Sequence, residues 1–196
     1  MSMDDVPHVE CRTRDEWRAW LEANHATANG VWLVTWKPSS GRGTLDYEAG
    51  VEEALCFGWV DSKGGVVDAE RTRLYFAQRN PKSGWARTNK ARVERLIADG
   101  RMAPAGLAAI ERAKANGAWT LLDDVENLVV PDDLAAAFAD HPPAADHWAA
   151  FPRSPRRAML EWIVQARRPE TRAARITEIA TAAARNERAF PRPSKD

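Results

Sequence analysis

The sequence predicts an α+β protein in which a small, mostly antiparallel sheet with packed helices is followed by a helical C-terminal part. Strand and helix patterns alternate in the first 78 residues, whereas only helical periods appear beyond Pro81. A chain of 196 residues is long enough for two compact parts. We therefore expect an α+β domain with a helical extension over residues 1–119, and a helical C-terminal region over residues 120–196.

The first part is expected to begin with a capped helix. In the segment Thr13-Arg14-Asp15-Glu16, the Thr13 hydroxyl can accept the backbone N–H of Glu16, and the Glu16 carboxylate can accept that of Thr13. The helix is expected to run to about Asn24. After Gly30, residues 31–36 are apolar on both alternating faces, which is typical of a central strand covered on both sides.

A helix, a sharp turn and two strands are expected next. Apolar residues recur at helical spacing over residues 47–57, and Gly58 is expected to end this helix in the left-handed conformation. A strand then follows over residues 59–63. Gly64-Gly65 is a candidate two-residue turn, which would let the chain fold back toward a further strand over residues 73–77.

The remaining chain shows five helical periods. They cover residues 83–98, 104–116, 131–139, 155–167 and 170–185. In the fourth of these, Met159, Trp162 and Ile163 share one apolar stripe. We therefore expect Trp162 to be a core residue of the second part, as we expect Trp59 to be in the sheet.

The charges are unevenly distributed along a chain whose formal net charge is zero. Residues 1–119 contain 17 basic and 16 acidic residues, residues 120–150 contain seven acidic and no basic residues, and residues 153–196 contain 11 basic and five acidic residues. This charge distribution has two interpretations. The basic tail pairs with the acidic stretch inside one molecule, or it forms a basic face for nucleic acid or anionic lipid. We favour the internal pairing.

Several classes of protein lack support in the sequence. No stretch approaches the roughly 18–20 uncharged apolar residues of a membrane span, and the first residues lack the features of a secretory signal, so we expect a cytoplasmic protein. The common nucleotide-binding, zinc-protease and serine-hydrolase motifs are absent. Neither the two cysteines nor the four histidines have metal-ligand spacing. No catalytic residue, cofactor or metal is therefore predicted.

Glu52 to Ser62 is the segment richest in chemically active side chains. Helical spacing places Glu52 beside Cys56, and a carboxylate raises the pKa of a neighbouring thiol, so Cys56 is expected to be a buried small hydrophobe rather than a nucleophile. Asp61 shares a strand face with Trp59. A carboxylate on an aromatic face is solvated, paired or directed at a ligand, and pairing is the simpler interpretation.

A second cluster follows the last expected strand, from Arg79 through Trp85 to Asn89. Trp85 and Asn89 stand four residues apart on one helix face, where an amide usually fastens a neighbouring backbone. Arg79, Asp61 and these two residues together offer a cation, a carboxylate, an aromatic surface and an amide. Such a set suits a peptide or a small polar ligand. The candidate ligand-binding residues are Trp59, Asp61, Arg79, Trp85 and Asn89.

Four segments in fixed order resemble the YdeI/OmpD-associated family, also called bacteriocin-protection proteins. They are EEALCFGWVDS, RLYFAQRNPKSGWARTNKARVERL, GRMAPAGLAAIERAKANGAW and EWIVQARRPETRAARI. The resemblance extends from about Trp17 to Arg188, and residues 134–185 correspond to the part that gives the family its name. It implies a bacterial stress protein linked to tolerance of bacteriocins and cationic antimicrobial peptides, with an envelope porin as partner of some relatives. It implies no catalytic residues.

The sequence thus favours a non-enzymatic binding or interaction protein in antimicrobial-peptide tolerance and envelope stress. An enzyme is one alternative, with Asp61 or Glu53 as general base and Arg79 stabilising an anion. A nucleic-acid-binding protein is the other. It would use the basic residues between Arg79 and Arg95, with Trp85 for stacking, although the neutral net charge argues against it.

Overall fold

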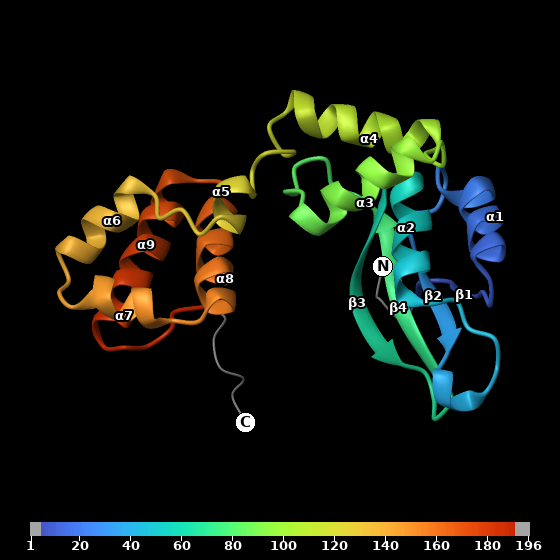
Figure 1. Ribbon diagram of the computed structural model, residues 1–196, viewed down its shortest axis with the longest axis horizontal. Helices are drawn as coiled ribbons and strands as arrows, with labels where there is room; N and C mark the ends of the chain where they lie inside the picture. Colours follow the sequence, from blue (N-terminus) through green and yellow to red (C-terminus); the bar gives the residue numbers. More distant parts are fainter. Residues whose placement is uncertain (1–4, 191–196) are drawn as a thin grey trace. The chain divides into compact units, whose positions relative to one another are not determined.

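The chain divides into two compact units, Met1–Trp119 and Thr120–Asp196. The computed structural model describes residues 5–190, and Figure 1 shows the order of the elements along the chain. Each unit has its own hydrophobic core.

The first unit contains a mixed four-stranded sheet of order β1-β2-β4-β3. Its strands are β1 (His8–Glu10), β2 (Gly30–Trp36), β3 (Trp59–Val66) and β4 (Arg71–Gln78). The β2–β4 and β4–β3 pairs are antiparallel, and the short β1 runs parallel to β2. The expected α+β fold with a small, mostly antiparallel sheet is therefore confirmed.

The hairpin between β3 and β4 does not turn at Gly64-Gly65, so this prediction is wrong. Strand β3 continues through both glycines to Val66, after a register shift between Asp61 and Gly64. The turn lies at residues 67–70, where the Asp68 carboxylate accepts hydrogen bonds from the backbone N–H groups of Glu70 and Arg71. An aspartate that bonds its own backbone in this way favours a turn.

Among residues 5–119, four α-helices and a short 3-10 helix, Pro38–Ser40, accompany the sheet. The α-helices are α1 (Arg14–Asn24), α2 (Tyr47–Cys56), α3 (Arg87–Ala98) and α4 (Pro104–Ala115). The capping box at Thr13 and Glu16 is present, and Gly58 has a φ of +74° just after α2, as the sequence predicts. Helix α4 approaches α2 closely at Gly106, where a Cβ atom would lie 2.2 Å from the Cys56 carbonyl oxygen.

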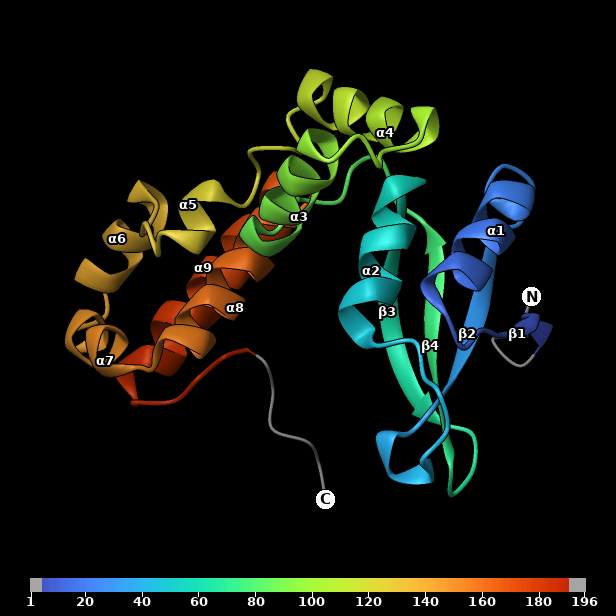
Figure 2. The same cartoon turned by 45° about the vertical axis from the view of Figure 1, so that its right-hand side comes forward.

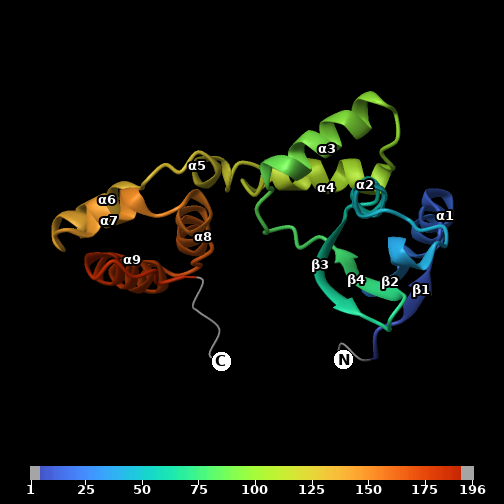
Figure 3. The same cartoon turned by 60° about the horizontal axis from the view of Figure 1, so that its bottom comes forward.

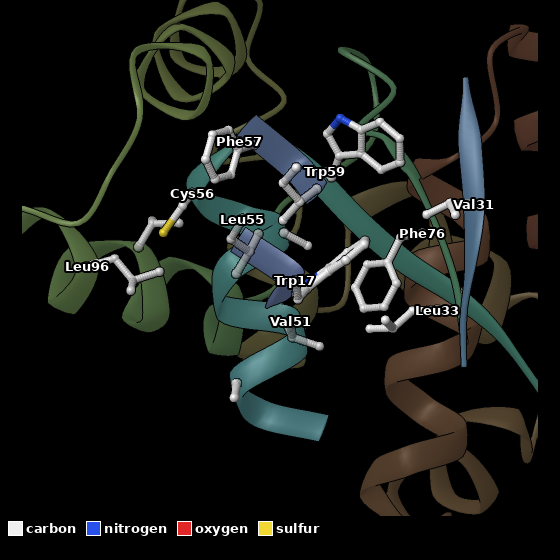
Figure 4. Packing of buried hydrophobic residues seen from close by; sticks show 14 of the residues in the cluster. Trp17, Val31, Leu33, Val51, Leu55, Cys56, Phe57, Trp59, Phe76 and Leu96 are labelled. Carbon is white, nitrogen blue, oxygen red and sulfur yellow. The ribbon is translucent and has the colours of Figure 1, made fainter. Parts of the chain in front are cut away.

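The core of the first unit lies between one face of the sheet and helices α1 and α2, which cover the same side of the sheet (Figures 2 and 3). Trp17 of α1 packs against Phe76 of β4 with a ring separation of 5.3 Å, as Figure 4 shows. Trp59 is fully buried beside them, so its expected core position is confirmed.

The second unit is helical, as expected. Its helices are α5 (Asp123–Glu126), α6 (Asp132–Ala139), α7 (Ala144–Ala150), α8 (Arg153–Val164) and α9 (Pro169–Ala184). Met159, Leu160 and Ile163 form the buried stripe of α8. Trp162 is only partly buried and stacks on Phe190, so its expected position in the core is wrong.

Ion pairs within the second unit join its basic helices to its acidic stretch. Arg157 lies 2.9 Å from Glu126, and Arg172 lies 2.7 Å from Asp133. These contacts are the internal pairing that the charge pattern favours. Within residues 5–190, no helix is both long and apolar enough to cross a bilayer.

Replacement of Trp59 by alanine is expected to lower the free energy of unfolding by about 3–5 kcal/mol, because it leaves a cavity beneath the sheet. Urea denaturation monitored by circular dichroism measures this loss. The control Val66→Ala changes a side chain on the same strand that is 67% exposed, and its effect should stay within about 0.5 kcal/mol. A loss below about 1 kcal/mol for Trp59→Ala would contradict the assigned core.

Candidate functional site

A cavity of about 520 Å³ lies in the first unit, between the core face of the sheet, the start of α2 and the segment after β2. Its wall is mostly apolar. The residues that form the wall include Leu33, Thr35, Leu45, Tyr47, Leu74 and Phe76. A volume of several hundred Å³ with an apolar wall is typical of small-molecule sites. We call this space the sheet cavity.

The sheet cavity exists because small residues face one another where large ones would fill the core. Gly64 and Gly65 of β3 and Gly50 of α2 contribute no side chains to its wall. On the core face of β2 and β4, Thr35 lies opposite Thr72, with their hydroxyl oxygens 3.4 Å apart. The sequence analysis missed this site. The pattern that could have indicated it is the Gly64-Gly65 pair, which we interpreted as a turn.

Tyr47 connects the sheet cavity to Asp61. Its hydroxyl donates a hydrogen bond of 3.0 Å to Oδ2 of Asp61, and its side chain is 59% exposed. Burial of the hydroxyl, together with the negative charge of Asp61, raises the pKa of Tyr47 above its ordinary value. The phenol is therefore a stable hydrogen-bond donor at neutral pH, and it holds Asp61 next to a residue of the cavity wall.

Asn89 lies in the first turn of α3. Its side-chain oxygen accepts a hydrogen bond of 2.8 Å from Arg92, and Arg92 also donates to both carboxylate oxygens of Glu48. The hydrogen bonds that Arg92 donates to Glu48 raise the pKa of Arg92, and the charge of Asp61 acts in the same direction. Asp61 and Asn89 thus have different hydrogen-bond partners, Tyr47 for Asp61 and Arg92 for Asn89.

Arg79 and Trp85 form a separate pair. The guanidinium carbon of Arg79 lies 4.1 Å from the centre of the Trp85 ring, and its Nη2 donates to the backbone carbonyls of Ser83 and Gly84. Burial lowers the pKa of Arg79 to about 10. Asp61 bonds to Tyr47 instead, so the structure gives the two proposed charges different partners.

Trp59, the fifth candidate residue, lies inside the core. Its indole N–H donates a hydrogen bond of 3.2 Å to the carbonyl of His25. Because its side chain is fully buried, Trp59 supports the sheet from within and contacts no open space.

Both cysteines are buried, free thiols. Burial raises the pKa of each thiol to about 11, so neither is a nucleophile at neutral pH. The carboxylate that adds to this effect at Cys56 belongs to Glu53 and not, as helical spacing suggested, to Glu52.

Glu53 is a fully buried carboxylate in the last turn of α2. Its oxygens lie 2.9 Å from Arg18 and 3.5 Å from Arg14, and they also accept a hydrogen bond from Arg101. An ionised carboxylate is tolerated inside a protein when charged partners surround it. Full burial also removes Glu53 as the accessible general base that the enzyme alternative requires.

Glu52 extends this ionic cluster toward the surface. It lies 2.6 Å from Arg14 and 2.6 Å from Arg95. Burial raises the pKa of Glu52, but hydrogen bonds from Arg95 and Arg14 outweigh this effect, so that its pKa lies below the ordinary value of 4.5. Across residues 5–190, no cluster of His, Cys, Asp and Glu side chains is arranged to hold a metal ion.

Comparison with known families places the two units in different groups. Residues 9–109 match a domain of unknown function (DUF8412), and this match spans about half of the chain, which therefore belongs to that family. Residues 127–186 match the family described as bacteriocin-protection, YdeI or OmpD-associated. No curated protein and no solved structure matches the chain significantly.

The resemblance to the YdeI/OmpD-associated family is thus confirmed. The part of the chain that matches this family is residues 127–186, which is shorter than the span from about Trp17 to Arg188 expected from the sequence. The segment EWIVQARRPETRAARI lies in the YdeI/OmpD-associated domain of the second unit. The segment EEALCFGWVDS, by contrast, lies within the match to the domain of unknown function. The family association therefore comes from the helical unit, whereas the sheet cavity belongs to the other.

The variant Glu53→Gln is expected to lower the free energy of unfolding by about 1–3 kcal/mol, because it weakens the charged hydrogen bonds between a fully buried side chain and three partly buried arginines, Arg14, Arg18 and Arg101. Chemical denaturation measures this value. Glu111→Gln is the matched control, since Glu111 is 71% exposed and pairs only with Lys114 at the surface. Its loss should stay within about 1 kcal/mol. Equal losses for the two variants would contradict the proposed role of the cluster.

The lowered pKa of Glu52 predicts a loss of stability in acid. A carboxyl group whose folded pKa lies below its unfolded value stabilises the protein above that unfolded value, and this contribution disappears as the pH falls through the folded pKa. Denaturation between about pH 3 and pH 7 should therefore show a smaller decrease on acidification for Glu52→Gln than for the wild type. An identical pH dependence in the two proteins would contradict the prediction.

Proposed function

We propose that this chain is a non-enzymatic, cytoplasmic binding protein of bacteria that contributes to tolerance of bacteriocins and cationic antimicrobial peptides. The observation that carries the proposal is the sheet cavity, a mostly apolar space of about 520 Å³ whose wall residue Tyr47 is hydrogen-bonded to the Asp61 carboxylate. The description of the family matched by residues 127–186 supports the biological context.

The sheet cavity suits an apolar side chain of a cationic peptide. Its wall offers Leu33, Leu74 and Phe76 to an apolar group. Next to this wall, Oδ2 of Asp61 is bonded to Tyr47, and its second oxygen has no partner among residues 5–190. A peptide that carries an apolar side chain next to a lysine or arginine can use both features. A free carboxylate makes a strong hydrogen bond with such a cation.

A binding role is favoured over catalysis by the positions of the charged groups. The enzyme alternative requires Arg79 to stabilise an anion near Asp61 or Glu53. Arg79 instead stacks on Trp85 and bonds to backbone carbonyls. We further propose that the second unit contacts an envelope protein, and the description of its family as OmpD-associated is the support for this partner.

A thermal-shift experiment with amphipathic Leu/Lys peptides tests the proposed site. Wild-type protein should be stabilised by about 2.7 kcal/mol at a peptide concentration of 100 Kd. Leu74→Trp fills the sheet cavity and should abolish the shift, whereas Ile97→Trp adds the same ring at a surface position of α3 and should keep it. Asp61→Asn should weaken the response to Leu/Lys peptides more than the response to uncharged Leu/Ser peptides. A shift that survives in Leu74→Trp would exclude the cavity as the site.

A bacterial strain that lacks the gene tests the biological role. Expression of the wild type or of Ile97→Trp should restore growth in the presence of a bacteriocin, whereas Leu74→Trp should not, provided that the three proteins accumulate equally. Equal rescue by all three proteins would separate the phenotype from the sheet cavity. Cell fractionation checks the proposed compartment.

A further inference from the structure

A compact basic and aromatic surface lies in the first unit, away from the residues that line the sheet cavity. The loop before α3 and the loop after α4 meet there. The side chain of Asn116 donates a hydrogen bond of 2.9 Å to the Pro81 carbonyl, and the backbone N–H of Trp85 donates one of 3.3 Å to the Ala118 carbonyl. We call this surface the Trp119 patch. Its members are Arg79, Lys82, Lys90, Arg112, Lys114 and Trp119.

The aromatic centre of the patch is a pair of tryptophans. The rings of Trp85 and Trp119 lie 5.1 Å apart. Trp85 is buried, whereas Trp119 is only partly buried and packs against the core. Because the buried ring supports it from one side, Trp119 is held in a fixed position while part of it remains accessible.

Cations surround both rings. The ammonium groups of Lys90 and Lys114 lie 5.2 Å and 5.8 Å from the centre of the Trp119 ring. Arg79 covers Trp85, and Arg112 lines the same small hollow as Arg79. Lys82 lies exposed in the adjoining loop. Each ring of the pair therefore has at least one cation directly over it.

Few acidic residues compensate this charge. The chain has none between Arg79 and Val93, and Glu111 is the single acidic residue between Gly100 and Leu122. Glu111 pairs with Lys114 at 2.9 Å, but an exposed ion pair of this kind contributes little free energy, so Lys114 can exchange this partner for a phosphate. The first turn of α3 also contains no acidic residue, so the positive end of its helix dipole adds to the local potential. The neutral net charge of the chain thus conceals a local excess of positive charge.

We propose that the Trp119 patch binds single-stranded nucleic acid, with one base stacked on Trp119 and the flanking phosphates on Lys82, Arg112 and Lys114. Proteins that bind single strands combine a basic surface with an aromatic ring on which a base stacks. An anionic membrane fits the surface less well. The large exposed apolar side chains of the first unit are Tyr47, Val66, Val67, Ile97 and Leu107, and none belongs to the patch.

Fluorescence anisotropy with a labelled 20-nucleotide single strand of DNA tests the proposal on the full chain. The logarithm of the association constant should fall against the logarithm of the salt concentration with a slope of about −2, since about three phosphates are contacted. Lys82→Glu/Arg112→Glu should reduce the magnitude of this slope by about 1.4. The control Lys63→Glu/Arg167→Glu makes the same change in net charge at exposed positions elsewhere, and it should bind like the wild type.

The stacking contact is tested separately. Trp119→Leu should weaken binding about tenfold, and an abasic strand of the same length should bind wild type about tenfold more weakly than the normal strand. Trp162→Leu changes a half-buried tryptophan of the second unit and should leave the affinity unchanged. Three results would overturn the proposal: no binding at low salt, equal responses of the two charge-reversal variants, or binding to phosphatidylglycerol vesicles without binding to the strand.

Discussion

The carboxylate of Glu53 is the group on which the arrangement of the first unit depends. It is fully buried, and it joins α2 to Arg14 and Arg18 of α1 and to Arg101 before α4. A buried charge is stable only while its partners remain in place, so this cluster fixes α2 against its neighbours. The start of α2 supplies Tyr47 and Gly50 to the wall of the sheet cavity. The shape of the cavity therefore depends on an ionic cluster at the opposite end of the same helix.

The first unit separates two kinds of chemistry. The wall of the sheet cavity is mostly apolar, and one of its residues, Tyr47, bonds to Asp61. The Trp119 patch is basic, and its arginine and lysine side chains lie over two indole rings. A mostly apolar wall beside the Asp61 carboxylate suits a cationic amphipathic ligand, whereas clustered cations suit an anion. The two proposed ligands are thus distinguished by charge as well as by shape.

The errors of the sequence analysis have identifiable physical causes. The Gly64-Gly65 pair is typical of a tight turn, but the Asp68 side chain stabilises a turn four residues later, and the glycines instead leave space in the sheet. Trp162 lies on the periodic apolar face of α8, yet the smaller Leu160 lies deeper. A helical pattern gives the direction of a face, but the neighbouring helices decide which residues of that face become fully buried.

By itself, the sequence determined the α+β class, the helical character of the second unit, the capped start of α1 and the glycine after α2. These features depend on contacts between residues close in the chain, and such contacts can be recognised from local sequence patterns. The five candidate ligand-binding residues stay a prediction, and none of them lines the sheet cavity. Only the tertiary structure decided that Asp61 bonds to Tyr47 and that Arg79 stacks on Trp85, because both choices depend on strand register and on loops that meet across the fold.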